Sequence, residues 1–101
     1  MKLWANDIAP DGYMHQHYWC ASVDEAKNII LQYEEQGEPF ESIAINPKAC
    51  TYMQKGGDYY NLISWLEQTR RNYPICIYSD DDVVIENMRL IIERNGWKEV
   101  K

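Results

Sequence analysis

The chain has 101 residues, with 10 basic and 16 acidic side chains and a formal net charge of −6. This length corresponds to a single domain, residues 1–101, and a hydrophobic fraction of 46% excludes an intrinsically disordered chain. The acidic balance and the scattered basic residues argue against direct nucleic-acid binding. No apolar stretch approaches the roughly 18 residues that cross a bilayer, so we expect no contact with a membrane.

The cysteines and histidines do not form a metal or disulfide pattern. Cys20, Cys50 and Cys76 are odd in number and lack CxxC spacing, so neither a disulfide framework nor a zinc ribbon is indicated. His15 and His17 share one face of an expected strand, but two histidines without a third ligand indicate an ordinary strand face. Polar residues follow the first few positions, which argues against a signal peptide. A cytoplasmic protein is expected.

The first half of the chain predicts two strands and a helix. A short apolar strand at 3–5 precedes a Pro/Gly loop, and an aromatic alternating segment at 13–20 predicts a second strand. Ser22 and Glu25 have the spacing of a capping box, so a helix begins after Ser22 and ends near Gly37. The loop between the two strands is too short for a normal crossover helix, which leaves the direction of the second strand open.

The second half predicts strands that alternate with amphipathic helices. The strands are expected at 40–45, 74–79 and 97–100, and the helices at 58–70 and from 80–81 to 95. The strand at 74–79 is apolar throughout, which favours a central position with both faces buried. This alternation predicts an α/β fold with a mainly parallel sheet of about five strands and about three helices.

Several short motifs together resemble the cyclic-phosphate processing receiver domains, over nearly the whole chain. They are Lys2-Leu3-Trp4 with Ile8 and Pro10, Ser22-Val23-Asp24-Glu25-Ala26, Gly56-Gly57-Asp58-Tyr59, Trp65-Leu66-Glu67, Glu86-Asn87-Met88-Arg89 and Asn95-Gly96-Trp97. The resemblance implies a compact, receiver-like three-layer fold. It also implies divalent-metal-dependent hydrolysis of cyclic phosphates, with Mg²⁺ held by acidic residues at the carboxyl ends of the first and third strands.

The chain departs from this family at the positions that would carry the chemistry. Asn6 stands at the first acidic position, and Asp7 is the acid that remains there. Asn46 and Lys48 stand in the segment that carries acidic residues in the family, and a lysine would repel a metal ion. On the fourth strand, Ser79 keeps a hydroxyl. These departures identify the chain as a catalytically degraded member, with no cofactor expected.

Two enzymatic or ligand-binding interpretations stay open beside that one. Asp7, Asp80 and Asp81 are residual candidates for a catalytic metal site, although aspartates there also cap a helix. In that case Mg²⁺ would be the cofactor of a cyclic phosphodiesterase or phosphatase. A nucleotide-binding sponge would instead use the same pocket without chemistry, with contacts from Asn6, Asn46, Lys48 and Ser79.

The leading expectation is a non-enzymatic protein that binds a macromolecular partner. The loop after the third strand is basic, apolar and aromatic where the family has acids, and the next helix begins with tyrosines, which are favoured at interfaces. The expected contacts are Lys48, Tyr52, Met53, Lys55, Tyr59 and Tyr60. An acidic protein complements a partner with a basic surface. Phage-encoded anti-defence inhibitors of the anti-CRISPR kind are small acidic proteins of this style.

Overall fold

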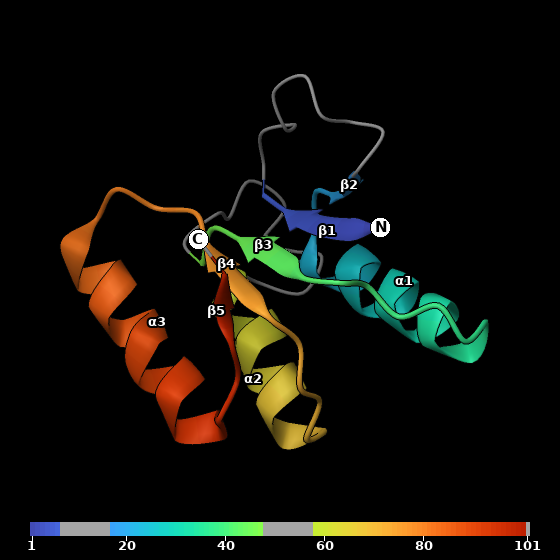
Figure 1. Cartoon of the computed structure of the whole chain (residues 1–101). Helices are drawn as coiled ribbons and strands as arrows, with labels where there is room; N and C mark the ends of the chain where they lie inside the picture. The colour runs from blue at the N-terminus through green and yellow to red at the C-terminus, as the bar shows by residue number, and fades with distance from the viewer. Residues whose placement is uncertain (7–16, 48–57, 101) are drawn as a thin grey trace.

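A computed structural model gives the fold, and it describes residues 1–6, 17–47 and 58–100. These residues form a five-stranded sheet and three helices (Figure 1). In chain order the elements are β1 (Lys2–Ala5), β2 (His17–Cys20), α1 (Val23–Glu35), β3 (Ile43–Ile45), α2 (Tyr60–Gln68), β4 (Ile75–Ile77), α3 (Asp82–Asn95) and β5 (Glu99–Val100). The α/β class with about five strands and three helices is confirmed.

All strand pairs of this sheet are parallel, in the order β2-β1-β3-β4-β5. Leu3 of β1 pairs with Tyr18 on one side and with Ile43 on the other, which fixes the open question of the direction of β2. This is the flavodoxin-like order, in which the chain reverses its course across the sheet between β1 and β3. Ligands in such sheets bind outside the carboxyl ends of the strands near that reversal.

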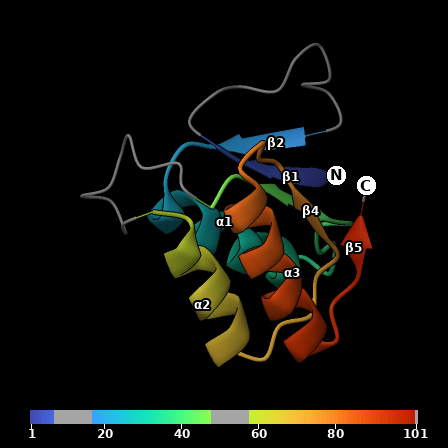
Figure 2. The same ribbon diagram turned by 90° about the vertical axis from the view of Figure 1, so that its left-hand side faces the viewer.

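The three helices lie on one face of the sheet (Figures 1 and 2). The connections β2–α1–β3, β3–α2–β4 and β4–α3–β5 all move across the sheet in the same direction. Because such crossovers are right-handed, this shared direction places their helices on the same side. The opposite face of the sheet carries no helix from the described residues.

The hydrophobic core lies between the helices and this one sheet face. Leu3, Ile43 and Ile75 are neighbours in register and are fully buried. The helices contribute buried residues at helical spacing, among them Ile30, Leu62 and Met88. Burying an aliphatic side chain of this size stabilises a fold by about 1.5–3 kcal/mol. This packing holds the carboxyl ends of the strands in a fixed relationship.

The helix ends follow the signals in the sequence. Ser22 Oγ accepts a hydrogen bond from the Glu25 amide at 3.2 Å, as the capping-box spacing predicts. The end of α3 is formed by Gly96, whose φ of +69° is a conformation that disfavours side chains with a Cβ. No described helix is long and apolar enough to span a bilayer.

Some strand expectations were wrong in extent. β3 and β4 have three residues each, shorter than expected, and residues 13–16 of the expected second strand lie outside the described residues. In β4, Ile75 is buried, whereas Cys76 and Ile77 are half-buried. The expectation that both faces of this strand are buried was therefore wrong. Only Ile75 is fully buried, because Cys76 points to the sheet face without described helices. His17 is half-buried on a strand face, as expected.

Candidate functional site

A cavity of about 620 Å³ lies at the carboxyl ends of β3 and β4. It is lined by Asn46, Ile77, Tyr78, Ser79, Asp80 and Asp81. Asn46 directly follows β3, whereas the other lining residues come from the end of β4 and the turn into α3. This is the edge of the sheet at which open α/β folds bind their ligands. The cavity therefore lies at the expected edge of the sheet, one strand beyond the reversal between β1 and β3.

Backbone hydrogen bonds across the strand ends hold this edge together. The Asn46 amide donates to the Ala5 carbonyl at 3.1 Å, and the Tyr78 amide donates to the Ile45 carbonyl at 2.8 Å. Asn6, which follows β1, donates its amide to the Cys20 carbonyl at 3.3 Å and is only 3% exposed. The parallel register thus continues for one residue beyond the strands and fixes the cavity wall.

The turn from β4 into α3 uses two polar side chains of the cavity for its own structure. Ser79 Oγ accepts a hydrogen bond from the Asp81 amide at 3.1 Å. Asp81 Oδ1 accepts from the Val83 and Val84 amides at 3.0 and 3.4 Å, so Asp81 is the N-cap of α3. The interpretation of these aspartates as helix caps is confirmed for Asp81. Asp80 is exposed and contributes the other carboxylate of the lining.

Aromatic side chains connect the cavity to the sheet face opposite the helices. Side chains alternate along a strand, so Cys76 and Tyr78 lie on that face while Ile75 and Ile77 face the helices. The rings of Trp4 and Tyr78 are 4.8 Å apart, and the rings of Trp4 and His17 are 5.7 Å apart. Tyr78 also lines the cavity, so it belongs to both surfaces.

The sequence analysis did not identify Tyr78 as a site residue. Trp4, whose ring contacts that of Tyr78, is half-buried on the face that carries no described helix. The signal was present in the two-residue alternation of the strands, combined with the rule for right-handed crossovers. Applied together, they place the aromatic positions of β1 and β4 on the uncovered face.

The surroundings of the Cys76 thiol disfavour its ionisation, and two carboxylates lie at the cavity. Burial and then the nearby charge of Glu99 raise the pKa of the Cys76 thiol, which disfavours the reactive thiolate. Asp80 and Asp81 place carboxylate oxygens at the cavity, the donor chemistry that Mg²⁺ prefers, although Oδ1 of Asp81 already accepts two amide protons. Within residues 1–6, 17–47 and 58–100, His, Cys, Asp and Glu do not gather in groups of three or more suited to a metal ion.

Four of the expected site residues line one cavity, and other candidates lie elsewhere. Asn46, Ser79, Asp80 and Asp81 all line the cavity. Tyr59 was expected at the surface, and this was wrong: it is 1% exposed because its ring packs in the core. Tyr60 is partly buried against the core. Asn6 is buried at the end of β1 and is not among the described residues that line the cavity. The other candidates, Asp7, Lys48, Tyr52, Met53 and Lys55, lie outside the described residues.

Comparisons of this chain with protein-family models, curated proteins and solved structures gave no match. The resemblance to cyclic-phosphate processing receiver domains therefore stays a prediction from sequence motifs. Function has to be argued from the cavity and from the aromatic residues that adjoin it.

Proposed function

We propose that this chain is a non-enzymatic binding protein that recognises a macromolecular protein partner at the carboxyl edge of its sheet. Binding is expected to involve the cavity formed by Asn46, Tyr78, Ser79, Asp80 and Asp81, together with the basic and aromatic loop after β3. Phage-encoded inhibitors of bacterial defence, acting in the host cytoplasm, are the class of protein we propose on the basis of size and charge.

The observation that carries this proposal is the use of Ser79 and Asp81 in the turn. A nucleophile or general base must have its oxygen available to the reacting atom. Ser79 Oγ and Asp81 Oδ1 instead accept backbone amide protons that fix the start of α3. Tyr78, which is 50% exposed, and the exposed carboxylate of Asp80 can contact a bound molecule. Recognition suits these groups better than catalysis.

A nucleotide-binding sponge is the second candidate, since Asn46 and Ser79 lie in one cavity. Their amide and hydroxyl groups can donate to ribose or phosphate oxygens, and a tyrosine ring offers a surface for a base. The two carboxylates oppose an anionic ligand, so this candidate depends on a cation such as Lys48. The enzymatic alternative would further require Mg²⁺ and Asp7.

Hydrolysis of a cyclic phosphate is the test that separates these possibilities. The protein would be incubated with a 2′,3′-cyclic nucleotide and Mg²⁺ or Mn²⁺, with phosphorus NMR as the readout and Asp7→Ala as the control variant. The proposal predicts an unchanged substrate. Turnover that disappears in Asp7→Ala would overturn it in favour of a hydrolase. Saturable binding without turnover, weakened in both Asn46→Ala and Ser79→Ala, would favour the nucleotide sponge.

A further inference from the structure

Four aromatic side chains share the sheet face opposite the helices, and the ring of Trp4 contacts those of His17 and Tyr78. We call Trp4, His17, Trp19 and Tyr78 the aromatic face. Trp4 pairs in register with Trp19 on one side and with the small Ala44 on the other. Because Ala44 has only a methyl group, the Trp4 ring can extend across β3 to the ring of Tyr78. Trp19 is held by a hydrogen bond from its indole Nε1 to the Asn6 carbonyl at 2.9 Å.

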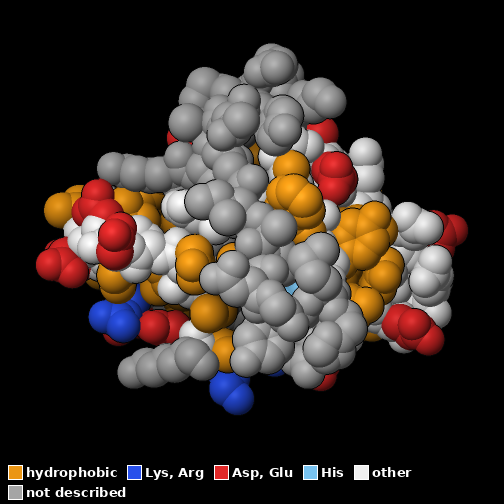
Figure 3. Space-filling model, turned by 90° about the horizontal axis from the view of Figure 1, so that it is seen from above, with side chains coloured by type: hydrophobic (Ala, Val, Ile, Leu, Met, Phe, Trp, Pro, Cys, Tyr) orange, Lys and Arg blue, Asp and Glu red, His pale blue; other side chains and the backbone are white. Residues whose placement is uncertain are grey.

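Two members of the aromatic face are exposed, whereas Trp4 and His17 are half-buried. Tyr78 is 50% exposed and Trp19 is 39% exposed. Figure 3, seen from this side of the molecule, shows hydrophobic and acidic side chains at the surface, with Lys and Arg side chains near its edges. Large aromatic rings that remain exposed and are fixed by neighbouring contacts are suited to be binding anchors, because little side-chain freedom is lost on association.

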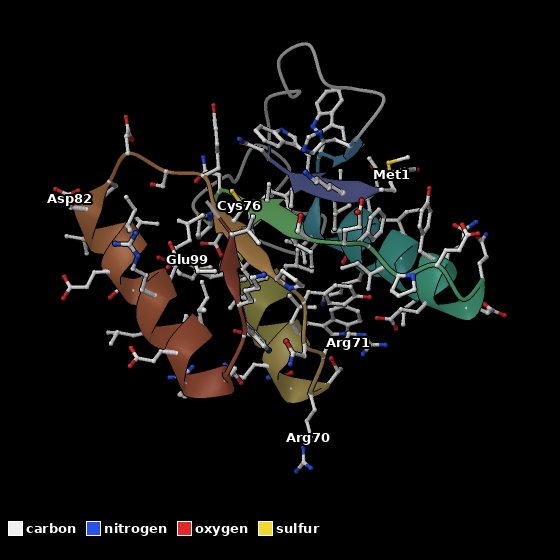
Figure 4. All side chains as sticks on the ribbon, in the orientation of Figure 1. Met1, Arg70, Arg71, Cys76, Asp82 and Glu99 are labelled. Atoms are coloured by element: carbon white, nitrogen blue, oxygen red, sulfur yellow. The ribbon has the colours of Figure 1, made fainter. Side chains whose placement is uncertain are left out.

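The adjoining cavity is negatively charged. Its described lining includes the carboxylates of Asp80 and Asp81 and no basic side chain, and Asp82 follows at the start of α3. Arg71, Arg89 and Arg94 form ion pairs with glutamates elsewhere in the fold. Arg70 extends from the molecule at the end opposite to Asp82 (Figure 4). Lys2 also lies on this sheet face, beside His17 at the start of β1 and so at the end of the strand away from the cavity. At the cavity end, the described charges beside Tyr78 are those of carboxylates, which favours a cationic group of the partner.

We infer that the aromatic face and the Asp80 carboxylate together dock an arginine side chain of the protein partner, an inference that rests on the proposed function. A guanidinium is flat, weakly hydrated and always charged, so it can stack on an aromatic ring while its N–H groups donate to a carboxylate. A lysine ammonium is compact and more strongly hydrated, and it lacks the planar surface for stacking.

The same chemistry already exists inside this fold. The Arg71 guanidinium lies 4.6 Å from the centre of the Trp65 ring. Its Nε and one terminal nitrogen donate to the Glu34 carboxylate at 2.9–3.2 Å. An arginine between an aromatic ring and a carboxylate is thus an arrangement that this chain uses internally. Tyr78 and Asp80 offer an external counterpart at the cavity.

Peptide titration of the complete ¹⁵N-labelled protein tests the inference. The probe is acetyl-(Arg-Gly-Gly)₃-amide at low ionic strength, and the comparison ligands are its lysine and glutamate counterparts and free agmatine. Signals of the Trp19 indole N–H and the Tyr78 amide report on the site. We expect saturable shifts with the arginine peptide and binding about fivefold tighter than that of the lysine peptide. Added salt should weaken the binding.

Matched variants locate the binding site. Tyr78→Ala should weaken binding of the arginine peptide about fivefold and Asp80→Asn about two- to threefold. Leu31→Ala, an exposed apolar position on α1, should leave binding unchanged. Equal affinity for the arginine and lysine peptides, agmatine binding as tight as the peptide, or no binding at all would each overturn the arginine inference. None of these results alters the hydrolysis test, so the proposed function is judged separately.

Discussion

The hydroxyl of Tyr59 donates a hydrogen bond of 2.8 Å to the backbone carbonyl of Cys20 inside the core. This bond joins the residue before α2 to the last residue of β2, two segments that are 39 positions apart in the chain. A buried hydroxyl and a buried carbonyl are both costly without a partner. Their pairing explains why Tyr59 lies inside rather than at a binding surface, and it links the helix layer to the edge strand.

Tyr59→Phe should therefore destabilise the protein. Removal of the hydroxyl takes away one hydrogen bond of the Cys20 carbonyl, which keeps the one from the Asn6 amide, so the free energy of unfolding should fall by about 0.5–1.5 kcal/mol. Urea denaturation of both proteins measures the difference. Tyr60→Phe is the matched control, because Tyr60 is only partly buried, and it should change stability by less than about 0.5 kcal/mol. Equal effects of the two substitutions would contradict this role of Tyr59.

Asp81→Ala should lower stability through the loss of a helix cap. Its carboxylate accepts the Val83 and Val84 amide protons at the start of α3, and such caps contribute about 0.5–2 kcal/mol. Asp80→Ala is the control one position earlier, where the side chain is exposed. Thermal and urea unfolding should show a loss for Asp81→Ala alone. A similar loss in both variants would mean that general charge near the helix, rather than capping, matters.

Acid should weaken the fold in part through Glu34. Burial raises the pKa of this carboxyl, but hydrogen bonds from Arg71 and Tyr73 and the charge of Arg71 outweigh burial and bring the pKa below its ordinary value. A pKa that is lower in the folded state stabilises the protein above the pKa of the unfolded chain, roughly 4.3. That stabilisation is lost as the pH falls through the folded-state pKa.

The free energy of unfolding measured between pH 7 and pH 3 tests this dependence. Glu34→Gln should be less stable than the parent at pH 7, and the gap should narrow toward pH 3 because the parent loses its ion pair there. Glu38→Gln, at an exposed position after α1, serves as the control. A stability gap that stays constant over this range would contradict the contribution of the Glu34–Arg71 pair.

The thiol of Cys20 should resist alkylation in the folded protein. Burial, followed by the charge and hydrogen bonding of Glu25, raises its pKa well above the ordinary range, and the residue is fully buried. Labelling with iodoacetamide and mass spectrometry should therefore show modification of Cys20 only at the rate of unfolding, and urea should accelerate it. Rapid labelling without denaturant would show that the β2 edge opens locally.

Interactions between residues close together in the sequence allowed much of the fold to be predicted. The Ser22 cap and the turn at Gly96 lie where their sequence neighbours indicate, because these interactions involve residues close together in the chain. The direction of β2 could not be read in this way. It depends on pairing with β1 across residues 7–16, and the parallel register became visible only in the assembled sheet.

The site was predicted in part. Asn46, Ser79, Asp80 and Asp81 were expected at one sheet edge, because parallel strands end together, and they line one cavity. Tyr59 was misplaced because its position before a helix does not say whether its ring turns inward to a distant carbonyl. Tyr78 was overlooked because its importance comes from Trp4, a residue 74 positions away, and from a sheet face free of described helices.

Site-specific photocrosslinking tests the central claim, that the cavity edge recognises a protein partner. A benzophenone amino acid would replace Tyr78 in one variant and Leu31 in another, both exposed positions, with crosslinking in the cells that produce the protein. The account predicts one defined protein adduct at position 78 and none at 31, and binding of that partner in purified form should weaken with Tyr78→Ala. Equal adducts at both positions, or none at 78, would contradict it.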